Sequence, residues 1–143
     1  MSRPDEIPPP PPGFTLQAGR GAFTNHNGPY FRRTSARDGV EQAFFALERH
    51  CNGVGLIHGG MLSAFLDGLL AGAVAAETQA TPITIHLSTD FLNMGRAGDW
   101  VFGHARLTRA TREIAFADGE ARVSDHVLAR ATGVFRLMRR RDP

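Results

Sequence analysis

The chain has 143 residues, 42% of them hydrophobic and 21% charged, which are ordinary proportions for one globular domain. Its net charge of +2 is too small to indicate a nucleic-acid partner. The single cysteine, Cys51, excludes an internal disulfide, and charges and prolines stand where an export signal would be apolar. We therefore expect a cytoplasmic protein.

Residues 1–22 are expected to form a proline-rich extension, partly disordered, ahead of one domain over residues 23–143. Five consecutive prolines, Pro8–Pro12, favour an extended polyproline conformation that has no core of its own. The candidate side chains for anchoring this segment to the domain are Phe14, Leu16 and Phe23.

Two strands are predicted next, Tyr30–Ser35 and Val40–Arg49, because the Asp38-Gly39 pair between them is a hairpin signal. A long helix is predicted over residues 60–76, which contain no proline and are rich in Ala, Leu and Met. Its apolar side chains occur on every face, which indicates a helix surrounded by protein. At about 25 Å, and interrupted by the charge of Asp67, this segment is expected to be too short to span a membrane.

Pro82 prevents any continuation of the helix, and alternation of apolar and polar residues then predicts strands. The four predicted strands are Ile83–Phe91, Trp100–Arg109, Glu113–Val123 and Val127–Met138. In the last of these, Ala129, Ala131 and Gly133 share one face and leave room for a helix. This order of elements predicts an α+β protein in which an antiparallel sheet curls around one buried helix.

The start of the helix lacks the usual capping residues. No Ser, Thr, Asp or Asn precedes it, and His58, Gly59 and Gly60 stand there instead. Backbone N–H groups at the positive end of the helix dipole can hold an anion, or an oxygen that becomes anionic during a reaction. The alternative is that Gly59 only completes a tight turn.

Asp67 is the one charged residue in the helix, among Phe65, Leu66, Leu69 and Leu70. A buried carboxylate is costly unless it is paired or functional, and burial would raise its pKa toward the range of a general base or nucleophile. The alternative is an Asp on the helix surface that points to water.

Asn52, the triplet His58-Gly59-Gly60 and Asp67, at these spacings, resemble the signature of the hotdog-fold acyl-CoA thioesterases of the phenylacetate-degradation (PaaI-like) type. Two further segments are similar to that family, Asn27-Gly28-Pro29-Tyr30 and the closing Ala129-Arg130-Ala131-Thr132-Gly133. The resemblance covers roughly residues 23–138 in one register. It implies a hotdog fold and the hydrolysis of an acyl-CoA to a free acid and CoA.

The resemblance also implies roles for single residues. The thioester carbonyl would be held by the Gly59 N–H and the Asn52 amide. Asp67 would activate a water as a general base or attack directly to form an anhydride, and both routes stay open. Thr84 matches the position at which related enzymes place a hydroxyl that positions the water.

Other residues are expected to assist. His58 and Gly60 would support the loop, with an acid–base role for His58 as the alternative. The candidates for substrate contact are Tyr30, Phe65 and His86. No cofactor is expected beyond the coenzyme A of the substrate itself, and the spacing of the histidines does not suit a metal.

Gly59 and Asp67 lie eight residues apart, roughly 12 Å along a helix axis. One reacting group cannot touch both within one chain, so either they do unrelated work or each site takes one residue from each of two subunits. The family uses the second arrangement. We therefore expect a homodimer, with pairing of dimers into a tetramer as a further expectation.

Two other functions compete with thioester hydrolysis as interpretations of this sequence. A hotdog hydratase or dehydratase usually needs an Asp–His pair on the helix, and this helix has no histidine. A non-catalytic acyl-CoA-binding protein should lack an activatable carboxylate. Cys51 as a nucleophile is disfavoured, because its sequence neighbours His50 and Asn52 would point away from it at a strand end.

Overall fold

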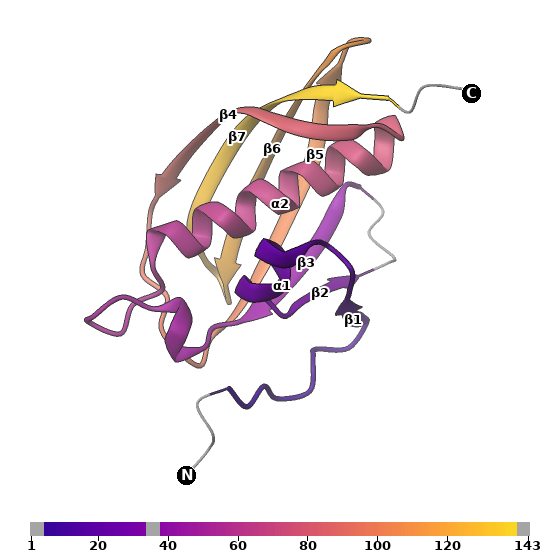
Figure 1. The fold of residues 1–143 in the computed structure, drawn as a ribbon. Coiled ribbons are helices and arrows are strands. Elements are labelled where there is room, and N and C mark those ends of the chain that lie inside the picture. The colour runs from indigo at the N-terminus through magenta and orange to yellow at the C-terminus, as the bar shows by residue number, and fades with distance from the viewer. Residues whose placement is uncertain (1–4, 34–37, 140–143) are drawn as a thin grey trace.

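The computed structural model describes residues 5–33 and 38–139. It consists of one seven-stranded antiparallel sheet and one long helix that crosses the concave face of the sheet (Figure 1). The strands are β1 (Phe14–Gln17), β2 (Tyr30–Arg33), β3 (Val40–Phe45), β4 (Thr81–Phe91), β5 (Trp100–Ala110), β6 (Ile114–Val123) and β7 (His126–Met138). The helices are α1 (Ala22–Asn27) and α2 (Gly59–Thr78), and a 3-10 turn covers Glu48–His50.

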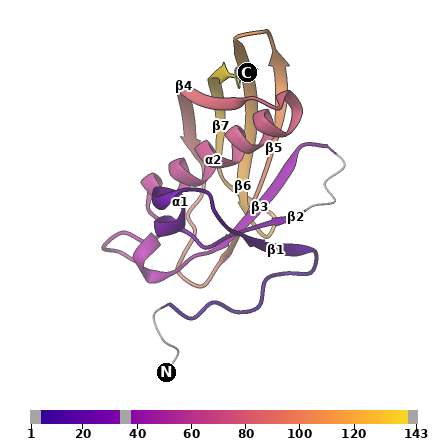
Figure 2. The same ribbon diagram turned by 45° about the vertical axis from the view of Figure 1, so that its right-hand side comes forward.

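The sheet has the strand order β1-β2-β3-β5-β6-β7-β4, and every neighbouring pair is antiparallel. Strand β4 follows α2 in the chain yet pairs with β7, so the sheet wraps around the helix from both sides, as the turned view shows (Figure 2). The prediction of an α+β protein with an antiparallel sheet around a central helix is confirmed.

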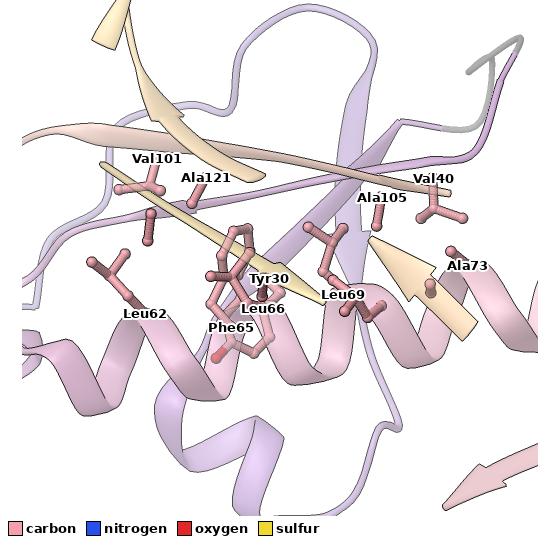
Figure 3. Packing of buried hydrophobic residues seen from close by; sticks show 14 of the residues in the cluster. Tyr30, Val40, Leu62, Phe65, Leu66, Leu69, Ala73, Val101, Ala105 and Ala121 are labelled. Atoms are coloured by element: carbon pink, nitrogen blue, oxygen red, sulfur yellow. The ribbon is translucent and has the colours of Figure 1, made fainter. Parts of the chain in front are cut away.

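Helix α2 packs one side against the sheet. Its buried residues are Met61, Leu62, Phe65, Leu66, Leu69, Leu70, Ala73 and Val74. Figure 3 shows several of these side chains pointing at Val101, Ala105 and Ala121 of the strands. The strands contribute small residues at the contact: a Cβ added to Gly103 would lie 2.6 Å from Leu69 Cδ2 and 2.7 Å from Phe65 ring carbons. The helix therefore contributes the large apolar side chains of the core, and the small residues of the strands leave the space that these side chains fill.

The other side of α2 is only partly covered by the residues that the structure describes. Ala64, Asp67, Gly68 and Ala71 are only half-buried. The expectation of a helix surrounded by protein on every face is therefore wrong for the single chain, because the sheet reaches only half of the helix circumference. By length and apolar composition α2 could cross a membrane, so the argument from length also fails. Its apolar side instead forms the core of the domain.

Strand β4 is an edge strand with exposed apolar side chains, among them Ile83 at 46% and Ile85 at 57% of full exposure. Its pairing with β7 shifts by one residue between Thr84 and His86, which places a bulge at Ile85. Thr84 and Leu87 therefore face the helix side, opposite Phe135 and Gly133. The simple alternation expected for this strand is broken at that point.

The N-terminal part holds two elements that the sequence did not predict, β1 and α1. Strand β1 pairs with β2 at the edge of the sheet. The side chain of Phe14 is buried there beside Phe31 and Ala43, whereas Leu16 and Phe23 are exposed and do not act as anchors. Part of the segment expected to be an extension thus belongs to the sheet.

The strand predicted over Val40–Arg49 is shorter in the structure, where β3 covers Val40–Phe45. The predicted end of the strand before it, Ser35, lies outside the described residues. Strand β3 ends at Phe45, where the Ala46 N–H turns to the carbonyl of Asp99 (2.8 Å). The chain then enters the 3-10 turn, which brings His50 beneath the loop that leads to α2.

Candidate active site

His58 is the N-cap of α2. Its Nδ1 accepts a hydrogen bond from the Gly60 N–H (2.7 Å), and its carbonyl accepts from Met61 (2.9 Å) and Leu62 (3.1 Å). The expectation of several free N–H groups is therefore wrong, because an imidazole nitrogen caps the helix. Among the described residues, only the Gly59 N–H of this first turn has no acceptor.

Asn52 is exposed at the base of the loop before α2. Its Oδ1 accepts from the N–H groups of Val54 (3.0 Å) and Leu56 (3.1 Å), so the loop fixes the orientation of the amide. The Nδ2 is then left to donate elsewhere. The bridge between Cys51 and Ile57 closes the loop and brings Asn52 to the same end of the helix as Gly59. We call Asn52, His58, Gly59 and Gly60 the donor cluster.

Thr84 and Asp67 are in direct contact. The Thr84 hydroxyl donates to Asp67 Oδ1 at 2.7 Å, from β4 to the partly open side of α2. The bulge at Ile85 makes this contact possible, since it turns Thr84 to the helix side. We call Asp67 and Thr84 the acid pair. The carboxylate is half-buried, so the single chain does not enclose it as the sequence led us to expect.

The donor cluster and the acid pair lie two turns apart on α2, roughly 12 Å from Gly59 to Asp67. The two clusters are therefore separate within one chain, too far apart to contact one reacting group together. A hollow of about 260 Å³ borders the donor cluster, where residues of α1, the 3-10 turn and α2 meet around His58 and Gly60. A larger one of about 500 Å³ lies on the outer face of the sheet, among paired charges, and neither cluster lines it.

The structure gives no support to the three predicted substrate contacts. Tyr30 is 6% exposed and Phe65 is 1% exposed, and both are packed with Phe44 in the core. Burial, the largest influence, raises the pKa of the Tyr30 hydroxyl to about 12. His86 pairs with Val134 on the outer face of the sheet, opposite to the face that carries Thr84.

The structure argues against Cys51 as a nucleophile and shows that His50 beside it in the sequence is buried and hydrogen-bonded. Burial raises the pKa of the Cys51 thiol, which disfavours the thiolate that a nucleophile needs. His50 was not among the predicted site residues, yet it is 3% exposed and hydrogen-bonded through both ring nitrogens next to Asn52. Its position in the sequence gave no signal except that it is close to Asn52. Within the described residues no group of three or more His, Cys, Asp or Glu side chains could hold a metal ion.

Comparison with known proteins supports a family assignment. A model of the thioesterase superfamily matches residues 54–130. A Pseudomonas aeruginosa protein named as a candidate esterase is 36% identical over 112 residues, which cover 77% of this chain and 84% of the relative.

Two solved structures extend the comparison. One is a candidate thioesterase of Ralstonia eutropha JMP134 related to phenylacetic acid degradation, with 28% identity, coverage of 90% and 92% of the two chains and a TM-score of 0.65. The other is a hypothetical thioesterase protein of Streptococcus pneumoniae, solved with coenzyme A, with 21% identity, coverage of 79% and 88% and a TM-score of 0.71. The chain therefore belongs to the thioesterase superfamily, as a hotdog-fold thioester hydrolase of the phenylacetate-degradation type.

Proposed function

We propose that this protein hydrolyses acyl-CoA thioesters at sites that each join the donor cluster of one subunit to the acid pair of another. The observation that carries the proposal is the contact between Thr84 Oγ1 and Asp67 Oδ1 on the uncovered side of α2. It is a carboxylate with a fixed orientation, open to the outside of the chain, with a hydroxyl beside it.

The separation of the two halves supports a shared site. A thioester carbonyl held at Gly59 must lie about 3 Å from its donors, and a water attacking the same carbon must lie at similar range from the carboxylate. Roughly 12 Å of helix between Gly59 and Asp67 excludes this within one chain. Two copies related by a two-fold axis would bring each donor cluster to the acid pair of the partner, and would create two equal sites.

The uncovered surface supports the same arrangement. The open side of α2 carries small residues, including Ala64 and Ala71, that allow close approach of another backbone. Beside it runs β4, which is an edge strand of the sheet in the described part of the chain. An unpaired strand edge next to a helix face of small residues is a surface that proteins normally cover, and a second copy of the chain related by a two-fold axis could cover it.

The chemistry follows from the groups present. The Gly59 N–H and the Asn52 Nδ2 would hold the carbonyl oxygen as it becomes negative. In the general-base route, Asp67 takes a proton from water while the water oxygen bonds to the thioester carbon. The C–S bond then breaks, and the departing thiolate of CoA takes up a proton. In the nucleophilic route, Asp67 bonds to the thioester carbon while the C–S bond breaks and the CoA thiolate departs and takes up a proton; water then hydrolyses the resulting anhydride, which releases the acid and restores Asp67.

The substrate assignment rests on chemistry and on one relative. The carboxylate of Asp67 suits attack on an activated acyl group, and a related thioesterase protein of Streptococcus pneumoniae was solved with coenzyme A. The hollow of about 260 Å³ beside His58 and Met61 has room for part of such a substrate. No cofactor is needed, because the reaction involves only water and the thioester.

The test measures release of free thiol from a panel of short, long and aromatic acyl-CoAs, with wild type and Asp67→Asn. The variant keeps the shape of the side chain and removes the base, so kcat should fall by about two orders of magnitude or more while KM changes little. Asp118→Asn, on the outer face where Asp118 pairs with Arg106 at 3.4 Å, is the matched control and should keep wild-type kinetics. Near-normal turnover in folded Asp67→Asn would refute the assignment.

A further inference from the structure

His50 lies buried beneath the donor cluster, with 3% of its surface exposed. The Leu47 N–H donates to its Nδ1 at 3.0 Å, and its Nε2 lies 2.7 Å from the carbonyl oxygen of Asn27. Its ring also packs edge-on against Phe44, with 5.5 Å between the ring centroids. Both ring nitrogens thus have backbone partners, and Nε2 also lies 3.1 Å from Nη1 of Arg49.

These contacts settle the protonation of the ring. A backbone N–H can only donate, so Nδ1 of His50 must be an unprotonated acceptor. With Nδ1 unprotonated, the single ring proton lies on Nε2, which donates it to the Asn27 carbonyl at 2.7 Å, so Arg49 Nη1 at 3.1 Å is a neighbour of Nε2 and not a donor to it. The ring is therefore a neutral imidazole in one tautomer. In agreement, burial lowers the pKa of His50, and the nearby Arg49 charge acts in the same direction while the bond to the Asn27 carbonyl opposes it.

His50 joins three segments that meet at the site. Its ring reaches back to Leu47 at the start of the 3-10 turn and across to Asn27 at the end of α1. Its own carbonyl accepts from the N–H of His58 at 2.9 Å, next to the first residue of α2. The loop that carries Asn52 starts two residues after the ring. The two ends of this loop therefore meet at one buried residue, whose backbone carbonyl holds the far end while its ring fixes the residue against Leu47 and Asn27.

The neighbouring residue Arg49 also links the 3-10 turn to the end of α1. The guanidinium of Arg49 donates to the carbonyls of His26 (2.8 Å) and Gly28, on either side of the carbonyl that His50 uses. Arg49 is largely exposed, whereas His50 is buried. The buried link is the one that water cannot replace, so its loss leaves the Asn27 carbonyl and the Leu47 N–H without partners.

We propose that His50 is a positioning residue for thioester hydrolysis: its neutral ring fixes the loop between Asn52 and Gly59 against α1, so that the two donors converge on one carbonyl oxygen. It does not touch the substrate. Donors to a developing oxyanion act within a narrow range of about 2.7–3.1 Å, and a displacement of about 1 Å can cost roughly a hundredfold in rate. The inference rests on the proposed acyl-CoA hydrolysis for its kinetic consequence, though not for its structural one.

The test compares three substitutions of His50. His50→Phe keeps a ring of similar shape and removes both hydrogen bonds. His50→Gln places an amide N–H near the position of Nε2 and can restore the bond to Asn27, and His50→Asn places an oxygen near Nδ1 and can restore the bond from Leu47. We expect kcat of His50→Phe to fall roughly 10- to 100-fold with KM changed less than about threefold. His50→Gln should recover at least about fivefold of that loss, because the link to α1 is the one that holds the loop.

The control is His126→Gln at the exposed start of β7, which should keep wild-type kinetics. Folded fraction and melting temperature are measured for every variant. The proposal is overturned if His50→Phe has the kcat of wild type, or if its lost activity equals its lost folded fraction and returns at lower temperature. It is also overturned if His50→Gln is no better than His50→Phe.

Hydrogen exchange keeps this inference separate from the proposed function. Amides of residues 52–60 should exchange faster in His50→Phe than in wild type, while amides of β5 and β6 should not change. A wild-type protein that releases no thiol from any acyl-CoA would refute the proposed function and leave this measurement valid. Unchanged exchange over residues 52–60 would overturn the role of His50 whatever the activity.

Discussion

Asp67 and Thr84 form the acid pair of the proposed site, and their mutual contact lies within one chain. The threonine hydroxyl has one hydrogen, which it gives to Asp67 Oδ1, and its two lone pairs remain able to accept a hydrogen bond from a water molecule. The pair therefore fixes the direction of the carboxylate and, in the proposed mechanism, provides a place for the water that attacks.

Thr84→Val tests this arrangement, because valine has the same shape without the hydroxyl. We expect kcat to fall roughly tenfold, less than for Asp67→Asn, since other groups still hold the carboxylate. Thr84→Ser retains the hydroxyl and should stay close to wild type. Steady-state kinetics with the best acyl-CoA decides, and a Thr84→Val enzyme with unchanged kinetics would reduce Thr84 to a strand residue.

His50 makes a second prediction at this scale, on stability rather than rate. Burial lowers its pKa in the folded state, so the unfolded chain takes up a proton more readily, near the ordinary value of about 6.5. The stabilisation is therefore fully present above about pH 6.5 and is lost as the pH falls below that value toward the folded-state pKa. His50→Gln cannot titrate and should lack this loss.

The measurement is the melting temperature of wild type and His50→Gln between pH 7.5 and 5. The difference in melting temperature between wild type and His50→Gln should become smaller as the pH falls. The charge of Arg49 and the other five histidines are common to both proteins and cancel in the comparison. A gap that stays constant over this range would show that His50 does not titrate against folding.

The elements show how far the sequence determines this fold. Helix α2 and strands β5, β6 and β7 lie within two residues of their predicted bounds, because their hydrophobic periodicity runs over ten residues or more. Strand β1 and helix α1, with 4 and 6 residues, are too short to show a period, and their positions depend on pairing with β2 and on hydrogen bonds with Arg49 and His50. Local sequence could not supply that information.

The candidate site divides in the same way. Asp67 and Gly59 were selected because their chemistry conflicts with their setting in an apolar helix. Thr84 could be connected to Asp67 only through the resemblance, since a bulge set by pairing with β7 decides which side it faces. His50 was missed because a buried histidine with two backbone partners looks, in the sequence, like any other histidine.

A prediction at this scale concerns the close contact of β5 with α2. Gly103 faces Leu69 and Phe65 with no room for a side chain. Gly103→Val should therefore lower the free energy of unfolding by roughly 1–3 kcal/mol through overpacking. Gly53→Ala, where nothing lies within 4 Å, is the matched control and should change stability little. Urea unfolding measures both, and equal stabilities would mean that the core has more room than this geometry allows.

For the whole molecule, the proposed site, shared between donor cluster and acid pair of two subunits, would make activity a property of the assembly. Asn52→Ala and Asp67→Ala should each be nearly inactive alone. When they are unfolded together and refolded in equal amounts, about half the dimers should be mixed, with one intact site and one doubly damaged site in each. Activity should recover to roughly a quarter of the wild-type value per subunit.

The outcome separates the two arrangements of the site. If all groups of a site came from one chain, no mixture could restore activity. Native mass spectrometry must show that mixed dimers form, and flat activity in their presence would rule out sites shared between subunits. Each variant, unfolded and refolded alone, gives the baseline activity against which the mixture is compared.

The bulge in β4 has a consequence for how this chain can change over time. Thr84 faces Asp67 only because one residue, Ile85, interrupts the alternation, while Leu87, Thr89 and Phe91 keep the inner side of the strand. A deletion of that single codon would remove the bulge and restore plain alternation, because His86 would then follow Thr84 directly and Leu87 would share the side of Thr84. The buried core and the donor cluster would survive such an event. The contact between Thr84 and Asp67 can thus outlast the irregularity beside it, and this strand could shorten by one residue without losing the acid pair.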